Sequence, residues 1–522
     1  MKLKIKETIY RLTQKKYIDV DETALQNIDK FITKTTKEIK INETQKSITV
    51  PVYNIDLINA REWIKELGFS KYWYNKKVFE YCLIKNNVVE IVSINTIIDI
   101  VTKYIYVYAD HNIKNKNLIL TAYNKSFSKL FMPINFEAFL PSIDKNYFLQ
   151  DTHNTSYFYF RNGLVEISKN KQIFRLYQDI DKYIWKDKLI EFDYNSNFSN
   201  GNKGVFEKFC KNICTNKKKN LFDAERFNTL QCVIGYLLHS YRDDSNKAII
   251  LSEANTAEGS NGGTGKSLIL KAINFLKNVV TINTANQGDE KYLFSEVQPG
   301  ITDIIFFDEC PKRFQLNNYF SIITGSININ EKYGKKITIQ GKDTPKLVFA
   351  TNYAITTVDA STKRRIFEFE LMPFYDDKHT PYKDFKALFW SKDWTQEDWQ
   401  DFYIFMLWCN RTYFDNDCKL PEYNSTTARI KKVANYSCIE FAEFMQDKLE
   451  KCNYDLSIKT FDLYNEFIQL YPEFNYVTNN RFTYWIKQYC NVFNLEYSKF
   501  LIRDGVNRYQ VYKIKNCQNI DN

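Results

Sequence analysis

Six consecutive residues near the middle of the chain have the composition of a phosphate-binding loop. They are Gly262, Gly263, Thr264, Gly265, Lys266 and Ser267. Apolar residues at 248–251 and at 268–270 flank them, which predicts a strand before the loop and a helix after it. Glycines allow backbone N–H groups to turn inward, and with the helix N-terminus they form an anion-binding nest. We expect the Lys266 ammonium to reach the β- and γ-phosphates of a nucleotide, and the Ser267 hydroxyl to bind Mg²⁺.

The loop departs from the strict pattern G-x-x-x-x-G-K-[ST] at one position. The pattern requires a glycine at position 260, where this chain has Ser260, and Gly259 lies one place earlier. This departure concerns the shape of the loop and leaves the expected roles of Lys266 and Ser267 unchanged. A glycine-rich surface turn is the alternative interpretation.

Two further apolar segments end in polar residues that could complete a nucleotide site. The segment 304–307 is followed by Asp308 and Glu309, and the segment 346–351 is followed by Asn352. Buried parallel strands have this composition, and α/β sheets bind ligands at the carboxyl ends of their strands. We expect Asp308 to hold Mg²⁺ and Glu309 to act as general base for an attacking water. Asn352 could hydrogen-bond the γ-phosphate or that water.

Two arginines, Arg364 and Arg365, come just before another predicted strand. An arginine at this place can stabilise transition-state charge on the nucleotide of a neighbouring subunit, which requires a ring of subunits. Surface arginines at a strand edge are the alternative interpretation.

A basic hairpin is predicted between the two acids and Asn352. Apolar and polar residues alternate over 328–339 on both sides of a Tyr-Gly-Lys-Lys tip. Lysines there could follow a phosphate backbone, and the tyrosine could stack on a base. A solvated charged loop is the alternative. The candidate nucleic-acid contacts are Lys332, Tyr333, Lys335 and Lys336.

The C-terminal segment, 436–516, has the outline of a winged helix-turn-helix. Its expected elements are helices at 438–449, 459–470 and 479–489, the last with an asparagine cap, and paired strands at 497–501 and 508–514. Residues 479–515 hold seven basic and two acidic side chains. We therefore expect contacts with the phosphates of duplex DNA through Arg481, Lys487 and Arg503. A winged helix that contacts protein is the alternative.

The overall composition limits the class of protein. The 522 residues are 44% hydrophobic and 16% aromatic, which excludes global disorder. A net charge of +10 suits a nucleic-acid partner without requiring one. The eleven cysteines are scattered, so we interpret them as reduced cytosolic thiols. The start of the chain resembles no signal peptide, and no apolar run reaches the length of about 18 residues that a membrane span needs.

Taken together, these motifs resemble those of the superfamily 3 helicases of viruses, phages and plasmids, a branch of the ring-forming AAA+ ATPases. Residues 265–267 look like motif A of that family, and the acids at 308–309 look like motif B. Asn352 stands where motif C has its asparagine, and the lysine hairpin precedes it, as the DNA-engaging hairpin does in the family. Arg364 and Arg365 stand where the family has its arginine finger.

The resemblance is strong over 248–370 and extends over about 200–510, and it implies a multidomain α/β protein with an AAA+ type P-loop ATPase core. The expected domains are an α+β N-terminal region of unknown role at 1–195, a helical domain at 200–245, the ATPase core at 246–375, a helical linker or lid at 376–435, and the winged helix at 436–516.

The resemblance also implies an ATP hydrolase that uses ATP and Mg²⁺ and acts as a replicative DNA helicase of a phage, plasmid or mobile element. The expected assembly is a hexamer in the cytoplasm of a bacterial host, and the expected partners are single-stranded DNA, duplex DNA and a separately encoded primase. An origin-binding or regulatory ATPase without unwinding, and an RNA helicase, are the alternatives.

We expect no primase or nicking centre in the chain. The Asp-x-Asp pairs Asp19/Asp21 and Asp179/Asp181 lack a strand-turn context, which favours solvated carboxylates. The sequence has only four histidines, and no two of them flank a single apolar residue as a nicking endonuclease would require.

Overall fold

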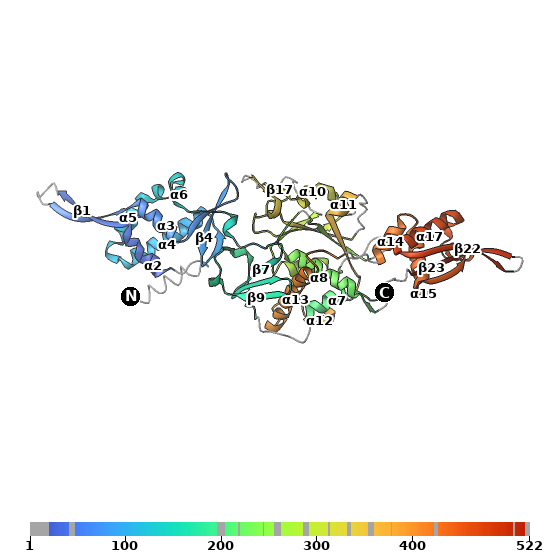
Figure 1. Cartoon of the computed structure of the whole chain (residues 1–522). Helices are drawn as coiled ribbons and strands as arrows, with labels where there is room; N and C mark the ends of the chain where they lie inside the picture. The colour runs from blue at the N-terminus through green and yellow to red at the C-terminus, as the bar shows by residue number, and fades with distance from the viewer. Residues whose placement is uncertain are drawn as a thin grey trace.

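The chain forms three bodies in a row, as the computed structural model shows (Figure 1). The N-terminal and C-terminal bodies lie at opposite ends, and a central body contains a five-stranded parallel sheet. Helices and several sheets contribute, so the fold is mixed α/β. The structure describes residues 20–516 except for 41–46, 196–203, 218–219, 244, 255–262, 285–291, 312–313, 331–335, 353–359, 377, 422–425 and 505–506.

The N-terminal body packs helices beside a long two-stranded ribbon. Helix α3 begins after Asp56, whose carboxylate accepts the N–H groups of Ile58 and Asn59, as an N-cap does. It ends before Gly68, which has a φ of 98° and donates its N–H to the Lys65 carbonyl, as a glycine that ends a helix does. The elements are α2 (Glu22–Gln26), β1 (Ile32–Lys40), β2 (Ser47–Ile55), α3 (Leu57–Glu66), α4 (Ile94–His111), α5 (Lys116–Leu130) and α6 (Pro133–Phe139).

A mixed five-stranded sheet joins this body to the central one. Its order is β10-β5-β4-β3-β6, with antiparallel pairs in the middle and a parallel strand at each edge. Because β6 and β10 come from later in the chain, they attach the following segment to the sheet. The strands are β3 (Phe69–Trp73), β4 (Phe79–Lys85), β5 (Val88–Ile91), β6 (Ser142–Ile143) and β10 (Ile184–Trp185).

A four-stranded sheet of order β11-β7-β8-β9 follows. Strands β7 and β8 form a hairpin, but the dipeptide Asn162-Gly163 does not make up its two-residue loop. Gly163 pairs with Phe160 inside the ladder, so the two loop residues are Arg161 and Asn162. A Cβ at Gly163 would lie 2.5 Å from the Phe174 ring, which explains the glycine within the strand. The strands are β7 (Thr155–Phe160), β8 (Gly163–Ser168), β9 (Lys171–Arg175) and β11 (Leu189–Ile190).

The central sheet has the order β15-β16-β19-β14-β20, and all its pairs are parallel. Strands β14 and β19 are buried along their whole length, because helices and loops cover both faces of the sheet. The elements of this part are β14 (Ala248–Glu253), α9 (Lys266–Ile273), β15 (Val279–Asn283), β16 (Ile304–Cys310), α10 (Phe320–Ile323), β19 (Lys346–Thr351), α11 (Ala360–Arg365) and β20 (Ile366–Leu371).

Two long helices pack against each other: α8, which precedes the parallel sheet in the sequence, and α13, which follows it. A Cβ at Gly235 of α8 would lie 2.2 Å from the Cys409 carbonyl of α13, so only glycine permits this approach. Phe158, Ile249 and Phe402 share one hydrophobic core, which joins the four-stranded sheet, the parallel sheet and α13. The remaining elements here are α7 (Val205–Asn212), β12 (Thr215–Asn216), β13 (Leu221–Phe222), α8 (Ala224–Leu238), α12 (Pro381–Phe385) and α13 (Gln396–Asp415).

The predicted hairpin before Asn352 is confirmed. Strands β17 (Ser326–Asn330) and β18 (Lys336–Gln340) pair antiparallel, with Asn330 opposite Lys336. Its isoleucines face a buried cluster, and polar residues alternate with them.

The described part of the C-terminal body contains four α-helices and a three-stranded antiparallel sheet of order β21-β23-β22. The first of these helices, α14 (Thr426–Ala434), contributes Ile430 and Val433 to the core of this body. Helix α17 begins after Thr478, whose hydroxyl accepts the Arg481 N–H at 3.3 Å, so the predicted asparagine cap is wrong. The short strand β21 was not predicted. The elements are α15 (Ile439–Lys451), β21 (Asp455–Lys459), α16 (Thr460–Leu470), α17 (Asn479–Phe493), β22 (Leu495–Asp504) and β23 (Asn507–Asn516). Within the described residues, no helix combines the length and apolarity needed to cross a bilayer.

Candidate active site

The candidate site lies at the edge of the parallel sheet where β14, β16 and β19 end. Glu253 is the last residue of β14, Asp308 and Glu309 lie near the end of β16, and Asn352 directly follows β19. Carboxyl ends of parallel strands meet at one edge of a sheet. Three segments separated by tens of residues in the sequence therefore place polar side chains next to the start of α9, which begins with Lys266.

The start of α9 has a backbone that only glycine accommodates. Gly265 has a φ of 105°, and a Cβ there would lie 2.5 Å from the Phe209 ring of α7. Gly263 also has a positive φ, of 82°, and no atom lies within 4 Å of the point that a Cβ would occupy there. This cradle leaves room beside the first N–H groups of the helix, as a phosphate requires. Gly262 lies outside the described residues.

Lys266 makes three polar contacts at this edge. Its Nζ lies 2.5 Å from Glu253 Oε1 and 2.7 Å from Asn352 Oδ1, and it lies 3.3 Å from Thr264 Oγ1. Glu253 is only 4% exposed, and Thr264 Oγ1 donates to the same carboxylate oxygen at 2.9 Å. An ammonium has three hydrogens, so in this arrangement Lys266 can reach a phosphate only by releasing one of these partners.

Ser267 and Asp308 face each other across the site. Ser267 Oγ donates to the Asp308 carboxylate, with distances of 3.2 and 3.4 Å to its two oxygens. A hydroxyl and one carboxylate are oxygen donors of the kind that Mg²⁺ takes from proteins, because it retains waters and phosphate oxygens as its other ligands. Among the described residues there is no cluster of three or more acidic, histidine or cysteine side chains that would hold a metal alone. The donor set thus fits a magnesium ion that is shared with a nucleotide.

Glu309 lies in a strained backbone conformation. Its φ is 55°, and the pairing of β16 with β19 shifts between Phe307 and Cys310. Thr284 Oγ1 holds this bulge from the side, at 2.8 Å from the Glu309 carbonyl oxygen. The bulge leaves the Glu309 side chain exposed at the end of the sheet, where a general base would meet an attacking water.

The two arginines at the end of α11 have different surroundings. Arg364 is exposed, whereas the Arg365 guanidinium is half-buried and lies 5.0 Å from the centre of the Phe320 ring. Strand β20 begins immediately after them and pairs with β14. Of the pair, Arg364 is therefore the side chain that a neighbouring molecule could contact.

The predicted nucleic-acid contacts are only partly within the described residues. Lys332, Tyr333 and Lys335 lie outside them. Lys336 is the first residue of β18 and is exposed.

The basic side chains of the C-terminal body are exposed. Arg481 and Lys487 lie on α17, with the Arg481 guanidinium over the Tyr484 ring. Arg503 lies on β22 opposite Arg508 of β23. Helix α17 and the β22–β23 hairpin thus both carry cations on one body.

Sequence reasoning missed Glu253. The signal was available, because Glu253 ends a buried apolar strand just as Asp308 and Glu309 do. Its contact with Lys266 depends on the folded loop, which the pattern alone does not provide.

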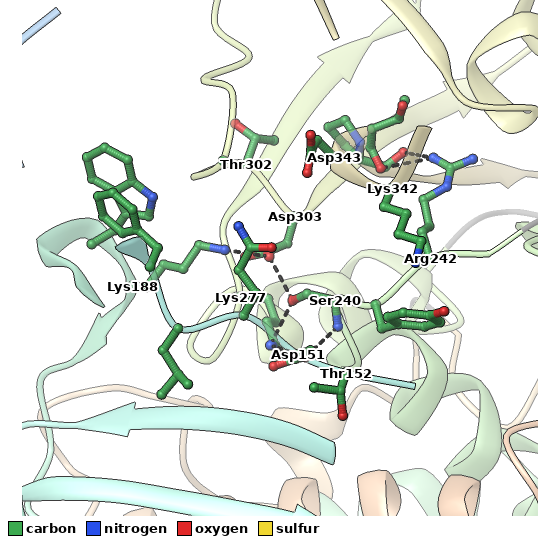
Figure 2. A pocket seen from close by; sticks show the side chains of 18 of the residues that line it. Asp151, Thr152, Lys188, Ser240, Arg242, Lys277, Thr302, Asp303, Lys342 and Asp343 are labelled. Carbon is green, nitrogen blue, oxygen red and sulfur yellow. Dashed lines mark hydrogen bonds and ion pairs between the residues drawn. The ribbon is translucent and has the colours of Figure 1, made fainter. Parts of the chain in front are cut away.

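A second polar cluster lies at the opposite edge of the sheet, where the strands begin (Figure 2). It borders a cavity of about 320 Å³. Asp303 Oδ1 accepts hydrogen bonds from Lys188 Nζ at 3.0 Å and from Ser240 Oγ at 2.8 Å. Burial acts to raise the pKa of Asp303, but Lys188 and Lys277 outweigh it, so the pKa lies below its usual value.

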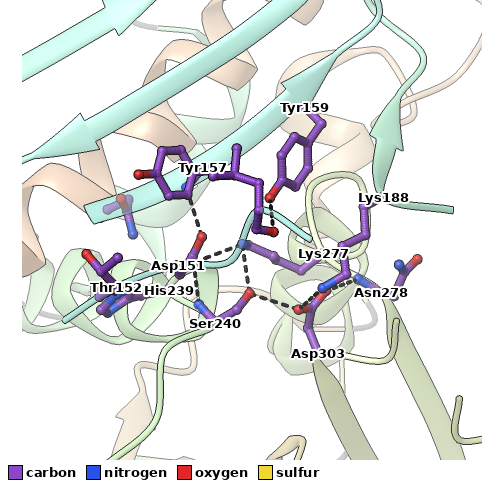
Figure 3. A network of polar contacts seen from close by, with 12 residues as sticks. Asp151, Thr152, Tyr157, Tyr159, Lys188, His239, Ser240, Lys277, Asn278 and Asp303 are labelled. Carbon is purple, nitrogen blue, oxygen red and sulfur yellow. Dashed lines mark hydrogen bonds and ion pairs between the residues drawn. The ribbon is translucent and has the colours of Figure 1, made fainter. Parts of the chain in front are cut away.

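The same cluster attaches the segment before β7 to the base of the sheet (Figure 3). Asp151 accepts the N–H groups of Tyr157 and Ser240, at 2.9 and 2.7 Å, and pairs with Lys277 at 3.4 Å. Because protein donors satisfy both carboxylates of the cluster, we interpret it as a structural joint.

His239 lies beside this joint in its neutral form. Its Nε2 is 2.7 Å from the Thr152 carbonyl oxygen, so Nε2 carries the proton. Burial lowers the pKa of His239 to about 4, although Asp151 acts to raise it; Lys346 and Lys277 add to the lowering.

Part of the chain is similar to a known protein family. Residues 257–365 match a family of unknown function (DUF5906), and this match includes Lys266, Asp308 and Asn352 of the candidate site but not Glu253. No curated protein matches the chain.

Two solved structures show distant similarity. The NrS-1 C terminal region, in its apo A form, is 11% identical with a TM-score of 0.37, over 86% of this chain and 98% of that one. A JCV helicase bound to a small molecule is 11% identical with a TM-score of 0.25, over 43% of this chain and 64% of that one. At these TM-scores neither similarity identifies a fold or a function for this chain.

Proposed function

We propose that the chain is an ATP-driven DNA helicase. The observation that supports this most directly is the convergence of Lys266, Ser267, Asp308, Glu309 and Asn352 at one edge of a parallel sheet. These side chains supply a phosphate-binding cation, oxygen ligands for a metal, a candidate base and an amide. Hydrolysis of a nucleoside triphosphate needs this combination.

Each residue has a separate role in the proposed reaction. Lys266 binds the β- and γ-phosphates of ATP, and the glycine-lined start of α9 donates backbone N–H groups to them. Ser267 and Asp308 hold Mg²⁺, which neutralises phosphate charge when it is bound. Glu309 accepts a proton from the attacking water, and Asn352 orients that water or the γ-phosphate.

The proposed active unit is a ring of copies, with six as the expected number. Arg364 is exposed at the end of α11, so it is the better candidate to reach the nucleotide of the next subunit. Arg365, which packs on Phe320, supports the position of α11.

The proposed nucleic-acid contacts lie on two bodies. Lys336 of hairpin β17–β18 is proposed to contact a single strand of DNA, as are Lys332 and Lys335, which lie outside the described residues. The C-terminal body, in which helices pack on a three-stranded sheet, is proposed to act as a winged helix that binds duplex phosphates through Arg481, Lys487 and Arg503.

The proposed setting is replication of a phage, plasmid or mobile element in the cytoplasm of a bacterial host. A separately encoded primase is the expected partner, because no primase centre is predicted in the chain.

Strand displacement on forked substrates tests this function. The purified chain should separate forked DNA only with ATP and Mg²⁺. Lys266→Ala should lower ATP hydrolysis by about 10²-fold or more, as expected when one preorganised contact to transferring phosphate is lost. Lys271→Ala is the matched control, since Lys271 lies exposed on the same helix, one turn on.

The alternatives give different results in the same assay. A regulatory or origin-binding ATPase would hydrolyse ATP without separating strands and would bind one duplex sequence tightly. An RNA helicase would separate forked RNA and leave forked DNA intact. ATP hydrolysis that survives Lys266→Ala would contradict the assignment of the site itself.

A further inference from the structure

A groove on the N-terminal side of the molecule has no role in the site described above. It has a volume of about 560 Å³. One wall is the turn between β3 and β4, which contains Asn75, Lys76 and Lys77; the other is the segment around the short 3₁₀ helix η3 (Lys145–Tyr147). The groove is therefore formed by two loops whose positions are set by the five-stranded sheet.

Three aromatic side chains line the groove: Tyr74, which packs against a buried cluster, and Trp73 and Tyr147. Tyr147 is 50% exposed, and its ring stacks on that of Tyr183 with an interplanar angle of 16°. Trp73, on the other side, donates its Nε1 hydrogen to Ser142 Oγ at 3.2 Å. Both rings are thus oriented by neighbours while part of their surface faces the groove. Partly exposed, supported aromatic rings are the platforms on which single-stranded bases stack.

Lysines accompany these rings. Lys76 and Lys145 line the groove, and the Lys71 ammonium lies 5.8 Å from the centre of the Trp73 ring. Asp144 is the lining acid, and its carboxylate accepts the Asn146 N–H at 2.8 Å as a turn cap. Cations beside aromatic rings are the combination that binds bases joined by phosphates.

The groove adjoins the hairpin β17–β18. Tyr74 and Val78, in the turn that forms one wall, pack against the buried cluster that contains Ile327 and Ile339 of the hairpin. On the other wall, Lys145 pairs with Asp343 at 2.6 Å, and Asp343 lies just after β18 in the 3₁₀ helix η9 (Gly341–Asp343). This ion pair is exposed and weak, so a phosphate can replace the carboxylate.

We propose that this groove binds single-stranded nucleic acid, with two or more bases stacked on Trp73 and Tyr147 and the backbone paired with Lys76 and Lys145. The inference rests on the proposed function, under which the strand is DNA that passes the hairpin and then enters the groove. If the groove bound no strand, removal of these side chains would leave the affinity for single strands unchanged.

Binding of labelled oligothymidylate to the full chain tests the proposal. The variant Tyr147→Ala/Lys76→Ala should bind about tenfold more weakly, because loss of one stacked base alone has an effect of that size. Removal of one lysine that contacts a phosphate should also lower the salt dependence, by about 0.7 in the slope of log K against log salt concentration. Binding to duplex DNA, assigned to the C-terminal body, should remain at the wild-type level.

The matched control is Tyr106→Ala/Lys114→Ala. Tyr106 is 45% exposed on α4, and Lys114 is exposed just beyond that helix, so the control removes the same chemistry from another surface of the N-terminal body. It should bind like the wild type. If the first variant unfolds, as its melting temperature would reveal, Lys76→Glu alone takes its place, with a larger loss expected at low salt.

The outcomes separate the two proposals. Wild-type affinity in the groove variant, or equal loss in the control, overturns the groove while strand displacement by the wild type still supports the helicase. A wild-type chain that binds no single strand and separates none overturns both. Equal weakening for oligouridylate and oligothymidylate supports the groove, whereas weakening for RNA alone overturns its assignment to DNA.

Discussion

Replacement of Glu253 by glutamine should change ATP binding and stability in opposite directions. Glu253 is buried and holds the Lys266 ammonium at 2.5 Å. The triphosphate must compete with this carboxylate for Lys266, and the carboxylate also repels it. Glutamine keeps the size of the side chain and can still accept a hydrogen bond from Thr264, but it removes the charge.

The size of the effect follows from the contact that is lost. A hydrogen bond to a charged group contributes about 1.5–3 kcal/mol, and about 1.4 kcal/mol corresponds to a factor of ten in a binding constant. We therefore expect Glu253→Gln to bind ATP about tenfold more tightly. Without nucleotide, the variant should be less stable than the wild type by about 1–3 kcal/mol, because the Lys266 side chain is only 11% exposed and loses its charged partner.

Calorimetric titration with ATP and chemical denaturation without nucleotide would measure the two effects. Glu473→Gln, an exposed carboxylate in the C-terminal body, is the matched control and should change neither. An unchanged or lower ATP affinity in Glu253→Gln would refute the competition that we infer.

Three further predictions concern the loop, the arginines and the joint below the sheet. Gly265→Ala should lose nucleotide binding, because the new Cβ meets the Phe209 ring and the positive φ costs about 1–3 kcal/mol. Arg364→Ala should leave the melting temperature unchanged but stop hydrolysis in the assembled ring, whereas Arg365→Ala should lower the melting temperature through lost packing. Because burial depresses the pKa of His239 to about 4, from an ordinary 6.5, only the unfolded chain binds this proton between those values, and the free energy of unfolding should fall by about 3 kcal/mol as pH drops from 6.5 to 4.

Each of these predictions has its own measurement. Nucleotide binding by Gly265→Ala at wild-type affinity would contradict the inferred backbone requirement. For the arginines, mixtures of Arg364→Ala with Lys266→Ala subunits should regain some hydrolysis, and a failure to do so would argue against a contact between subunits. A His239→Gln variant should show a flatter dependence of melting temperature on pH than the wild type over pH 4–6.5, and an equally steep one would exclude His239 as a cause.

Much of the candidate site could be predicted from local sequence. Gly263, Gly265, Lys266 and Ser267 lie within five consecutive residues of the chain. The two glycines were predicted to form the loop because glycine tolerates its backbone angles, and both have a positive φ in the structure. The apolar strands β16 and β19 carried their own signal, because burial on both faces requires continuous apolar residues. The hairpin β17–β18 was predicted from its alternating isoleucines, but its register was not, and Lys336 of the predicted tip pairs with Asn330 in the ladder.

Local detail was less predictable where a competing contact decided it. Thr478 rather than an asparagine caps α17, since its hydroxyl reaches the Arg481 N–H. Asn162 occupies the turn after β7 because its side chain bonds both backbone groups of Tyr194, a residue 32 positions away.

By itself, then, the sequence predicted the glycine-rich loop with Lys266 and Ser267 and many of the strands and helices, since these depend on neighbours within a few positions. Only the tertiary structure decided that Glu253 meets Lys266, that Arg364 is exposed while Arg365 packs on Phe320, and that Trp73 and Tyr147 line one groove. The physical reason is that these contacts join segments far apart in the chain or depend on which side of an element is covered. The spacing of apolar residues along the chain does not predict such contacts, because they form only when the sheets and helices pack together.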